Sequence, residues 1–179
     1  MAVESAIRDL VQKMTAERGK LLGQIEKLSE KEAEYVPQDA QGEAQWTAKE
    51  QCAHVAEMES GYRAWVEKAM EEDNPDLTDV RGGPVAVPLE QANKHPLSRL
   101  VAELRRQRNE TLRVIERLRP KDYDRPATSP MFGTLTILQW LRSYYRHDRM
   151  HQAQIAGRKS DYKPHFIKGE PDQRRTKPL

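Results

Sequence analysis

The sequence lacks several features that would assign it to a well-marked class of protein. Its single cysteine, Cys52, excludes an internal disulfide framework and is typical of a reducing compartment. No apolar stretch approaches the roughly 18 residues that a membrane span needs. Residues 1–10 mix charged and apolar side chains and contain no signal-peptide core. We therefore expect a cytoplasmic protein that does not enter the membrane.

The sequence also has little net charge. Its 30 Lys and Arg residues nearly balance 28 Asp and Glu residues, which leaves +2 at pH 7. Nucleic-acid-binding proteins usually concentrate basic residues on one face, so this balance gives no support for binding nucleic acid. A local excess occurs in residues 158–179, which contain seven basic and three acidic residues together with three prolines. We expect this stretch to be an extended basic tail that lies over the main domain or a partner subunit.

Sequence motifs for several common reactions are missing as well. No Ser-His-Asp arrangement, glycine-rich phosphate loop or Cys-x-x-Cys motif is present. The 179 residues are 37% hydrophobic and 32% charged, and the mean hydropathy is −0.90. Long amphipathic helices fit these values, because each helix buries only a stripe of its surface.

Four segments have apolar residues at helical spacing, and none alternates convincingly as a β-strand does. They span residues 7–28, 47–72, 96–119 and about 134–156. We therefore predict an all-α protein, a four-helix bundle in residues 1–157. The connection from Asp73 to His95 is long enough to cross over the bundle and let the second and third helices run parallel. Residues 34–45 and 120–133 are predicted to be loops.

Capping residues mark where these helices begin and end. Thr47 with Glu50, and Thr136 with Gln139, form capping boxes in which side chain and backbone satisfy each other's free groups. Pro96 is a favoured helix-start residue. Gly157 is well placed to cap the end of the fourth helix.

Two histidines in the fourth predicted helix are separated by four residues. His147 and His151 therefore project from one face of the helix, one turn apart, and can bind a single metal ion. The glutamate of the helical metalloprotease motif is absent from the residues between them, which excludes that activity. Without a further ligand, two amphipathic residues at a helix seam are the simpler interpretation of the pair.

His54 supplies the further ligand. It lies within the apolar stripe of the second helix, where an unpaired imidazole would need a partner. Three inward histidines would provide three nitrogen ligands and leave coordination positions open, which is typical of catalytic rather than structural metal sites.

Two stretches of the sequence resemble the DinB-like (YfiT-like) superfamily. The first is Trp46-Thr47-Ala48-Lys49-Glu50 followed by His54-Val55-Ala56-Glu57, and the second is His147-x-x-x-His151 with Gln152 to Ile155 behind it. The resemblance implies a four-helix bundle with a long crossover, often a homodimer. It implies a site for one divalent metal ion, zinc or nickel, at His54, His147 and His151. It also implies action on a small molecule, as a hydrolase or as a transferase that uses a low-molecular-weight thiol.

Three functions remain open at this point. A metal-activated water would favour hydrolysis, and a metal-activated thiol would favour thiol transfer. The sequence offers no obvious carboxylate base for the site, which slightly favours the thiol. The third possibility is a non-catalytic stress or scaffold dimer in which the ion fastens two helices. No catalytic residue can be assigned from the sequence.

The other candidate residues have simpler interpretations. Cys52 is about 200° around the helix from His54 and should be a small buried side chain. Asp148 could orient a ligand, although a surface ion pair with Arg146 or Arg149 is the simpler interpretation. Tyr62, Tyr144 and Tyr145 could line a pocket or belong to the core. Histidines 95 and 165 are expected to lie in a loop and in the tail. The arginines of the third helix are expected to form surface ion pairs with Glu103, Glu110 and Glu116.

Overall fold

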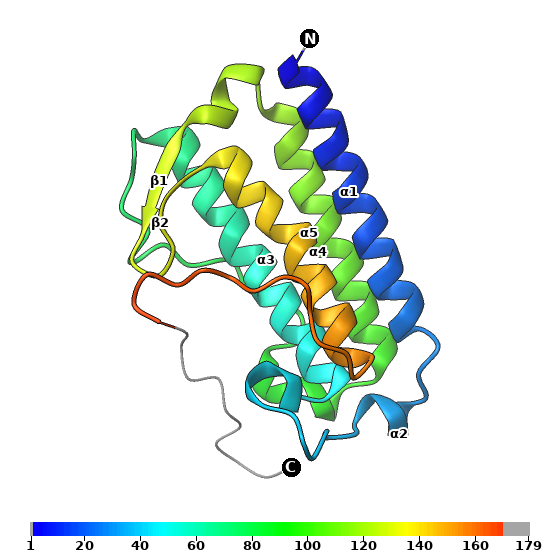
Figure 1. The fold of residues 1–179 in the computed structure, drawn as a ribbon. Helices are drawn as coiled ribbons and strands as arrows, with labels where there is room; N and C mark the ends of the chain where they lie inside the picture. Colours follow the sequence, from blue (N-terminus) through cyan, green and yellow to red (C-terminus); the bar gives the residue numbers. More distant parts are fainter. Residues whose placement is uncertain (1, 170–179) are drawn as a thin grey trace.

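Four long helices form the body of the protein in the computed structural model, which describes residues 2–169 (Figure 1). These helices are α1 (Ala2–Ile25), α3 (Ala48–Glu71), α4 (Leu97–Arg117) and α5 (Ile137–Ile155). The connections contain a short helix α2 (Glu30–Ala33), three 3-10 turns η1 (Gly42–Gln45), η2 (Leu89–Lys94) and η3 (Pro120–Asp124), and strands β1 (Pro126–Ser129) and β2 (Gly133–Thr136). The predicted four-helix bundle is confirmed.

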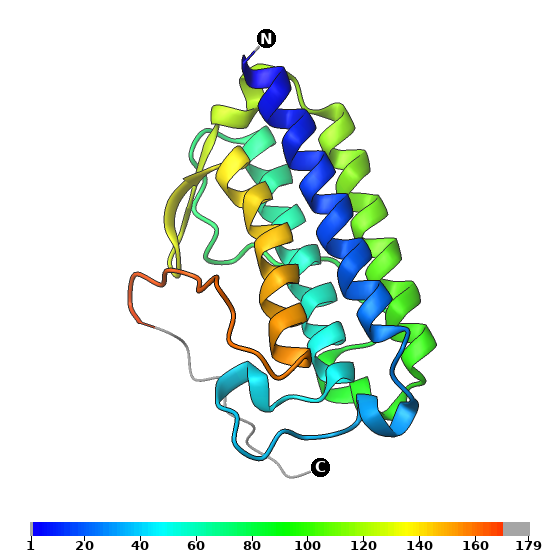
Figure 2. The same ribbon diagram turned by 45° about the vertical axis from the view of Figure 1, so that its right-hand side comes forward.

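The long crossover makes α3 and α4 run in the same direction. In Figures 1 and 2, α3 and α4 both run upward, whereas α1 and α5 both run downward. Helix α3 packs against α4 and α5, and α1 packs against α5. Both predicted capping boxes are present, with Thr47 and Glu50 at the start of α3 and Thr136 and Gln139 at the start of α5. The local sequence therefore sets where these two helices begin.

The connection between α4 and α5 differs from the prediction of a plain loop. Strands β1 and β2 form an antiparallel hairpin, in which Pro126 lies opposite Thr136 and Ser129 lies opposite Gly133. Thr128 also makes a parallel bridge to Asp76 in the crossover. Each strand has only four residues, too few for a clear alternating pattern, and the hairpin is supported by Asp76, which lies 52 residues before Thr128. The 3-10 turns η1 and η2, in the connections before and after α3, were missed because they too are short.

The crossover packs closely on α3 through a glycine. A β-carbon at Gly82 would lie 2.6 Å from the backbone of Ser60 and Gly61, so only glycine fits there. The Ser60 hydroxyl donates a hydrogen bond to the Gly83 carbonyl oxygen, at 2.9 Å. These contacts fix the crossover against the middle of α3.

The apolar core is divided into two parts. The first contains Leu10, Met14, Val66 and Trp140, and the second contains Leu21, Ile25, Cys52 and Leu104. Each long helix also has one buried charged residue that lies, along the chain, between the residues it contributes to the two parts. These four residues, which we call the polar layer, are Arg18, Glu59, Arg108 and Asp148.

The end of α5 turns the chain back over the bundle. Gly157 has a positive φ of 64°, and the amides of Gly157 and Arg158 donate to the carbonyl oxygens of Gln154 and Ala153. This is the glycine cap that the sequence predicted. The following residues, 158–169, which we call the C-terminal segment, cross one face of the bundle toward the β hairpin (Figure 1). Residues 170–179 of the predicted basic tail lie outside the described residues.

Among residues 2–169, none of the helices is both long enough and apolar enough to cross a membrane.

Candidate metal centre

Four side chains with metal-binding atoms converge at one end of the bundle. They are Glu43 of η1, His54 of α3, and His147 and His151 of α5, and one potential ligand atom of each lies within 4.8 Å of the others. We call them the histidine–glutamate cluster. The Nε2 atoms of His147 and His151 are 3.0 Å apart, and the Glu43 carboxylate lies 3.2 Å from His54 Nε2 and 3.7 Å from His151 Nε2. The structure thus brings the three predicted histidines together and adds a carboxylate.

Helix geometry explains how the histidines meet. His147 and His151 are one turn apart on the face of α5 that packs against α3, and His54 lies about two turns into α3 from its Thr47 cap. The ring centroid of His54 is 5.1 Å from that of His147 and 5.3 Å from that of His151. Two packed helices therefore fix three of the four potential ligands.

Glu43 is the functional residue that the sequence analysis missed. It lies in a connection predicted to be a loop, where no periodicity indicates which way a side chain points. Gly42, immediately before it, has a positive φ of 58° and turns the chain toward the bundle. The Glu43 side chain is only 10% exposed and faces His54. The expectation that no carboxylate base is available at the site is therefore wrong.

Gln51 controls the orientation of His151. Its amide nitrogen donates to the Trp46 carbonyl oxygen at 3.3 Å, so its oxygen faces His151 Nδ1 at 3.0 Å. An oxygen acceptor at this position requires the proton on Nδ1 and leaves the lone pair of Nε2 directed into the cluster. Such a partner behind a ligating imidazole is common in metal sites. The Trp46 ring also packs edge-on against His54, with centroids 4.9 Å apart.

Burial keeps two of the imidazoles neutral. Loss of solvent, and then the neighbouring His54, lowers the pKa of His147 to about 4. Loss of solvent, followed by the neighbouring His147 and His54, lowers the pKa of His151 well below its ordinary 6.5. Neutral imidazoles are the form that binds metal ions. With the Nε2 atoms of His147 and His151 converging at 3.0 Å, the donor set of three imidazoles and one carboxylate fits a zinc-like divalent ion.

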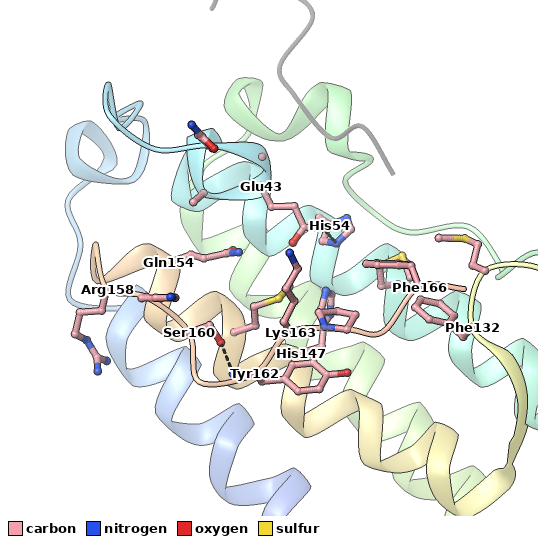
Figure 3. Close-up of a pocket in the computed structure, with 18 of the residues that line it drawn as sticks. Glu43, His54, Phe132, His147, Gln154, Arg158, Ser160, Tyr162, Lys163 and Phe166 are labelled. Atoms are coloured by element: carbon pink, nitrogen blue, oxygen red, sulfur yellow. Dashed lines mark hydrogen bonds and ion pairs between the residues drawn. The ribbon is translucent and has the colours of Figure 1, made fainter. Parts of the chain in front are cut away.

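A cavity of about 480 Å³ opens onto the cluster (Figure 3). Glu43, His54 and His147 form part of its wall, whereas His151 is fully buried behind them. Much of the remaining wall consists of apolar or aromatic side chains, namely Met58, Tyr62, Met131, Phe132, Met150 and Phe166. The cavity therefore gives a small molecule access to the cluster.

The polar layer lies directly behind the cluster. Asp148 accepts hydrogen bonds from Arg18 at 2.8 Å and from Arg108 at 2.9 Å. Glu59 accepts from the same two arginines, at 2.5 Å from Arg18 and 2.8 Å from Arg108. The remaining Arg18 nitrogen donates to the Leu104 carbonyl oxygen, and that of Arg108 donates to the Met14 carbonyl oxygen. All four side chains are almost completely buried.

Two sequence predictions are wrong here. Asp148 was expected to pair at the surface with Arg146 or Arg149, but its exposed fraction is 0% and its partners lie on α1 and α4. Arg108 and Glu103 of α4 were expected to be surface residues, but both are buried. A charged residue on a helix looks the same in sequence whether its partner is water or a residue on another helix.

The other candidate residues from the sequence analysis lie outside the histidine–glutamate cluster. Cys52 is buried in the second part of the core, and burial raises the pKa of its thiol to about 12, which excludes a thiolate role. Tyr62 borders the cavity, whereas Tyr144 and Tyr145 are buried in the first part of the core. His95 contacts Arg99 at the start of α4, and His165 is exposed on the C-terminal segment.

Comparison with known proteins agrees with this fold. Residues 13–155 match the model of the DinB superfamily, and the chain belongs to that family. A similar solved structure is that of YfiT from Bacillus subtilis, which is described as a probable metal-dependent hydrolase with an unusual four-helix bundle topology. The two chains share 16% identity over 84% of each chain, with a TM-score of 0.68. No curated protein matches the sequence.

Proposed function

We propose that this protein is a metal-dependent hydrolase of a small molecule, and that His54, His147 and His151 hold one divalent ion, zinc or nickel. The observation that supports the proposal most directly is the position of the histidine–glutamate cluster in the wall of a cavity. The description of the similar YfiT protein as a probable metal-dependent hydrolase adds support. A cytoplasmic homodimer remains part of the proposal.

The residues around the site would each have a separate task. A divalent ion, when bound, supplies a Lewis acid that lowers the pKa of water or of a thiol. Gln51 holds the His151 ring in one tautomer and one orientation. The apolar wall formed by Met58, Phe132 and Met150 would lower the polarity around the cluster and so strengthen its electrostatic interactions.

Glu43 changes the balance between hydrolysis and thiol transfer. Hydrolysis needs a base that takes a proton from water and returns it to the leaving group, and a carboxylate can do both. Glu43 lies on the cavity wall beside the histidines, near the start of the short 3-10 turn η1 rather than on a long helix. A carboxylate there is consistent with hydrolysis, whereas thiol transfer does not require one. We therefore favour hydrolysis.

The scaffold alternative has weaker support. A structural metal site usually has four protein ligands and no access for a small molecule. Here a cavity reaches three of the four side chains of the cluster. If Glu43 were a permanent fourth ligand, however, the site would resemble a structural one, so the role of Glu43 decides between the two functions.

The decisive experiment compares Glu43→Gln with His151→Ala. Zinc and nickel affinities would be measured by calorimetry, and turnover would be measured on p-nitrophenyl esters and on amide substrates. We expect Glu43→Gln to retain metal affinity within about tenfold and to lose at least about 100-fold in turnover, the usual contribution of a general base. His151→Ala should lose both. A Glu43→Gln variant that loses the metal as completely as His151→Ala would contradict the proposal and support a closed structural site.

A further inference from the structure

The C-terminal segment forms one wall of the cavity over the cluster. Tyr162, Lys163, Pro164 and Phe166 all line the cavity, and Figure 3 shows Tyr162, Lys163 and Phe166 around it. The segment lies outside residues 13–155, which match the family. This wall is therefore a feature that the family match does not account for.

Several contacts hold this segment against the bundle. The Ile167 amide donates to the Met131 carbonyl oxygen at 2.9 Å, and the rings of Phe166 and Phe132 are 5.1 Å apart. Asp161 pairs with Arg149, and the Arg146 guanidinium lies 5.9 Å from the centroid of the Tyr162 ring. The segment is thus attached to both the β hairpin and α5.

A second cavity of about 340 Å³ lies on the other side of this wall. Tyr162, Lys163 and Pro164 border both cavities, and so do His147 and Tyr62. The segment therefore divides the space beside the cluster into two chambers. Lys163 belongs to the partition between them, and Figure 3 shows its side chain extending toward Glu43 and His54.

The charges around the two chambers are mostly positive. Arg158, Lys159 and Lys163 border the first chamber, and Arg146 and Lys163 border the second. Glu43 is the single acidic residue lining either chamber in the described part of the chain. Asp161, the acidic residue of the segment, is 67% exposed and pairs with Arg149. A bound divalent ion would add further positive charge.

We propose that the substrate is a small molecule with an apolar body and an anionic group, a carboxylate or a phosphate, and that Lys163 binds the anionic group. This inference rests on the proposed function, because it takes the cavity over the cluster as the substrate site. The apolar side chains of the first chamber, including Met58, Phe132 and Phe166, would hold the apolar body. The Lys163 ammonium would donate a charge-assisted hydrogen bond to the anion.

Simple probes test this proposal without knowledge of the natural substrate. Octanoate, octyl phosphate, octanol and octylammonium would be titrated calorimetrically into the full-length protein, both metal-free and loaded with zinc. We expect the two anions to bind roughly tenfold tighter than octanol, as one charge-assisted hydrogen bond implies, and octylammonium to bind most weakly. Butanoate should bind at least about tenfold more weakly than octanoate, because each buried methylene changes affinity about fourfold. The ratio between octanoate and octyl phosphate identifies the preferred anion.

Two lysine variants locate the anion. Lys163→Gln should reduce the preference for octanoate over octanol to about twofold or less, with zinc and without it. Lys168→Gln is the matched control, since Lys168 is exposed on the same segment and lines neither cavity; it should keep the full preference. Equal binding of octanol and the anions by the wild type would overturn the proposal. A preference that appears only with zinc, or that survives in Lys163→Gln, would also overturn it, because the anion would then be bound elsewhere.

This experiment separates the inference from the proposed function. Zinc and nickel affinities would be measured on the same samples, and Lys163→Gln should bind both ions as the wild type does. A wild type that binds neither zinc nor nickel but prefers anions through Lys163 would refute the hydrolase and keep the anion site. A wild type that binds zinc but shows no preference for anions would refute the anion site alone.

Discussion

The polar layer and the histidine–glutamate cluster lie next to each other, since Asp148 of the layer follows His147 of the cluster on α5. They differ in how their polar atoms are satisfied. In the layer, two arginines and two carboxylates cancel in charge and bond to one another and to backbone carbonyl groups. In the cluster, the Nε2 atoms of His147 and His151 converge on one another beside a cavity. The layer is therefore a closed structural network, whereas the cluster is open to a ligand.

The largest effect should come from breaking the layer. Asp148→Ala would leave Arg18 and Arg108 buried without one of their two carboxylate partners, and removing one member of such a network costs about 3–5 kcal/mol. Urea denaturation would measure the loss of unfolding free energy. Asp161→Ala is the matched control, because it removes an aspartate paired with Arg149 at the surface and should leave stability almost unchanged. Similar losses in the two variants would contradict the closed network.

Acid should weaken the same layer. Burial alone would raise the pKa of Glu59, but the charges of Arg108 and Arg18 outweigh it and lower the pKa to about 2, below its ordinary 4.5. Because the folded pKa is the lower one, the stabilisation is fully present above pH 4.5 and is lost as the pH falls from 4.5 toward 2, by on the order of 2–3 kcal/mol. Urea denaturation at pH 6, 4.5 and 3 would measure this loss, and the NMR shift of the Glu59 carboxyl carbon would follow its titration. A carboxyl carbon that titrates near pH 4.5 would contradict the pKa shift.

Breaking the cluster should affect stability least and metal binding most. His147→Ala should abolish retention of zinc, yet lower the unfolding free energy of the metal-free protein by only about 1 kcal/mol, because the ring borders a cavity and belongs to no closed network. His95→Ala, which removes a histidine from a loop outside the cluster, should change neither property. Melting curves with and without a chelator would complete the test. Protein that unfolds on chelation would contradict the open catalytic site and support the scaffold function.

Much of the fold could be predicted because it depends on local patterns. Helical spacing of apolar residues and the Thr47 and Thr136 capping boxes predicted the four long helices, and the length of the crossover predicted that α3 and α4 are parallel. The β hairpin was missed because its strands are short and are supported by Thr128 pairing with the distant Asp76. Contacts that depend on residues far apart in sequence leave no periodic signal.

The site likewise combines features that follow from local patterns with features that depend on contacts between distant residues. Spacing along the chain is enough to place His147 and His151 on one helix face and His54 in an inward stripe, because the helix sets the direction of each side chain. By contrast, it is the packing of distant segments that brings Glu43 to the histidines, buries Asp148 with Arg18 and Arg108, and makes Lys163 face the cavity. Glu43 and Lys163 lie outside the long helices, where spacing along the chain does not set direction. The partners of Asp148 are 130 and 40 residues away, so its burial is a property of helix packing and not of any local pattern.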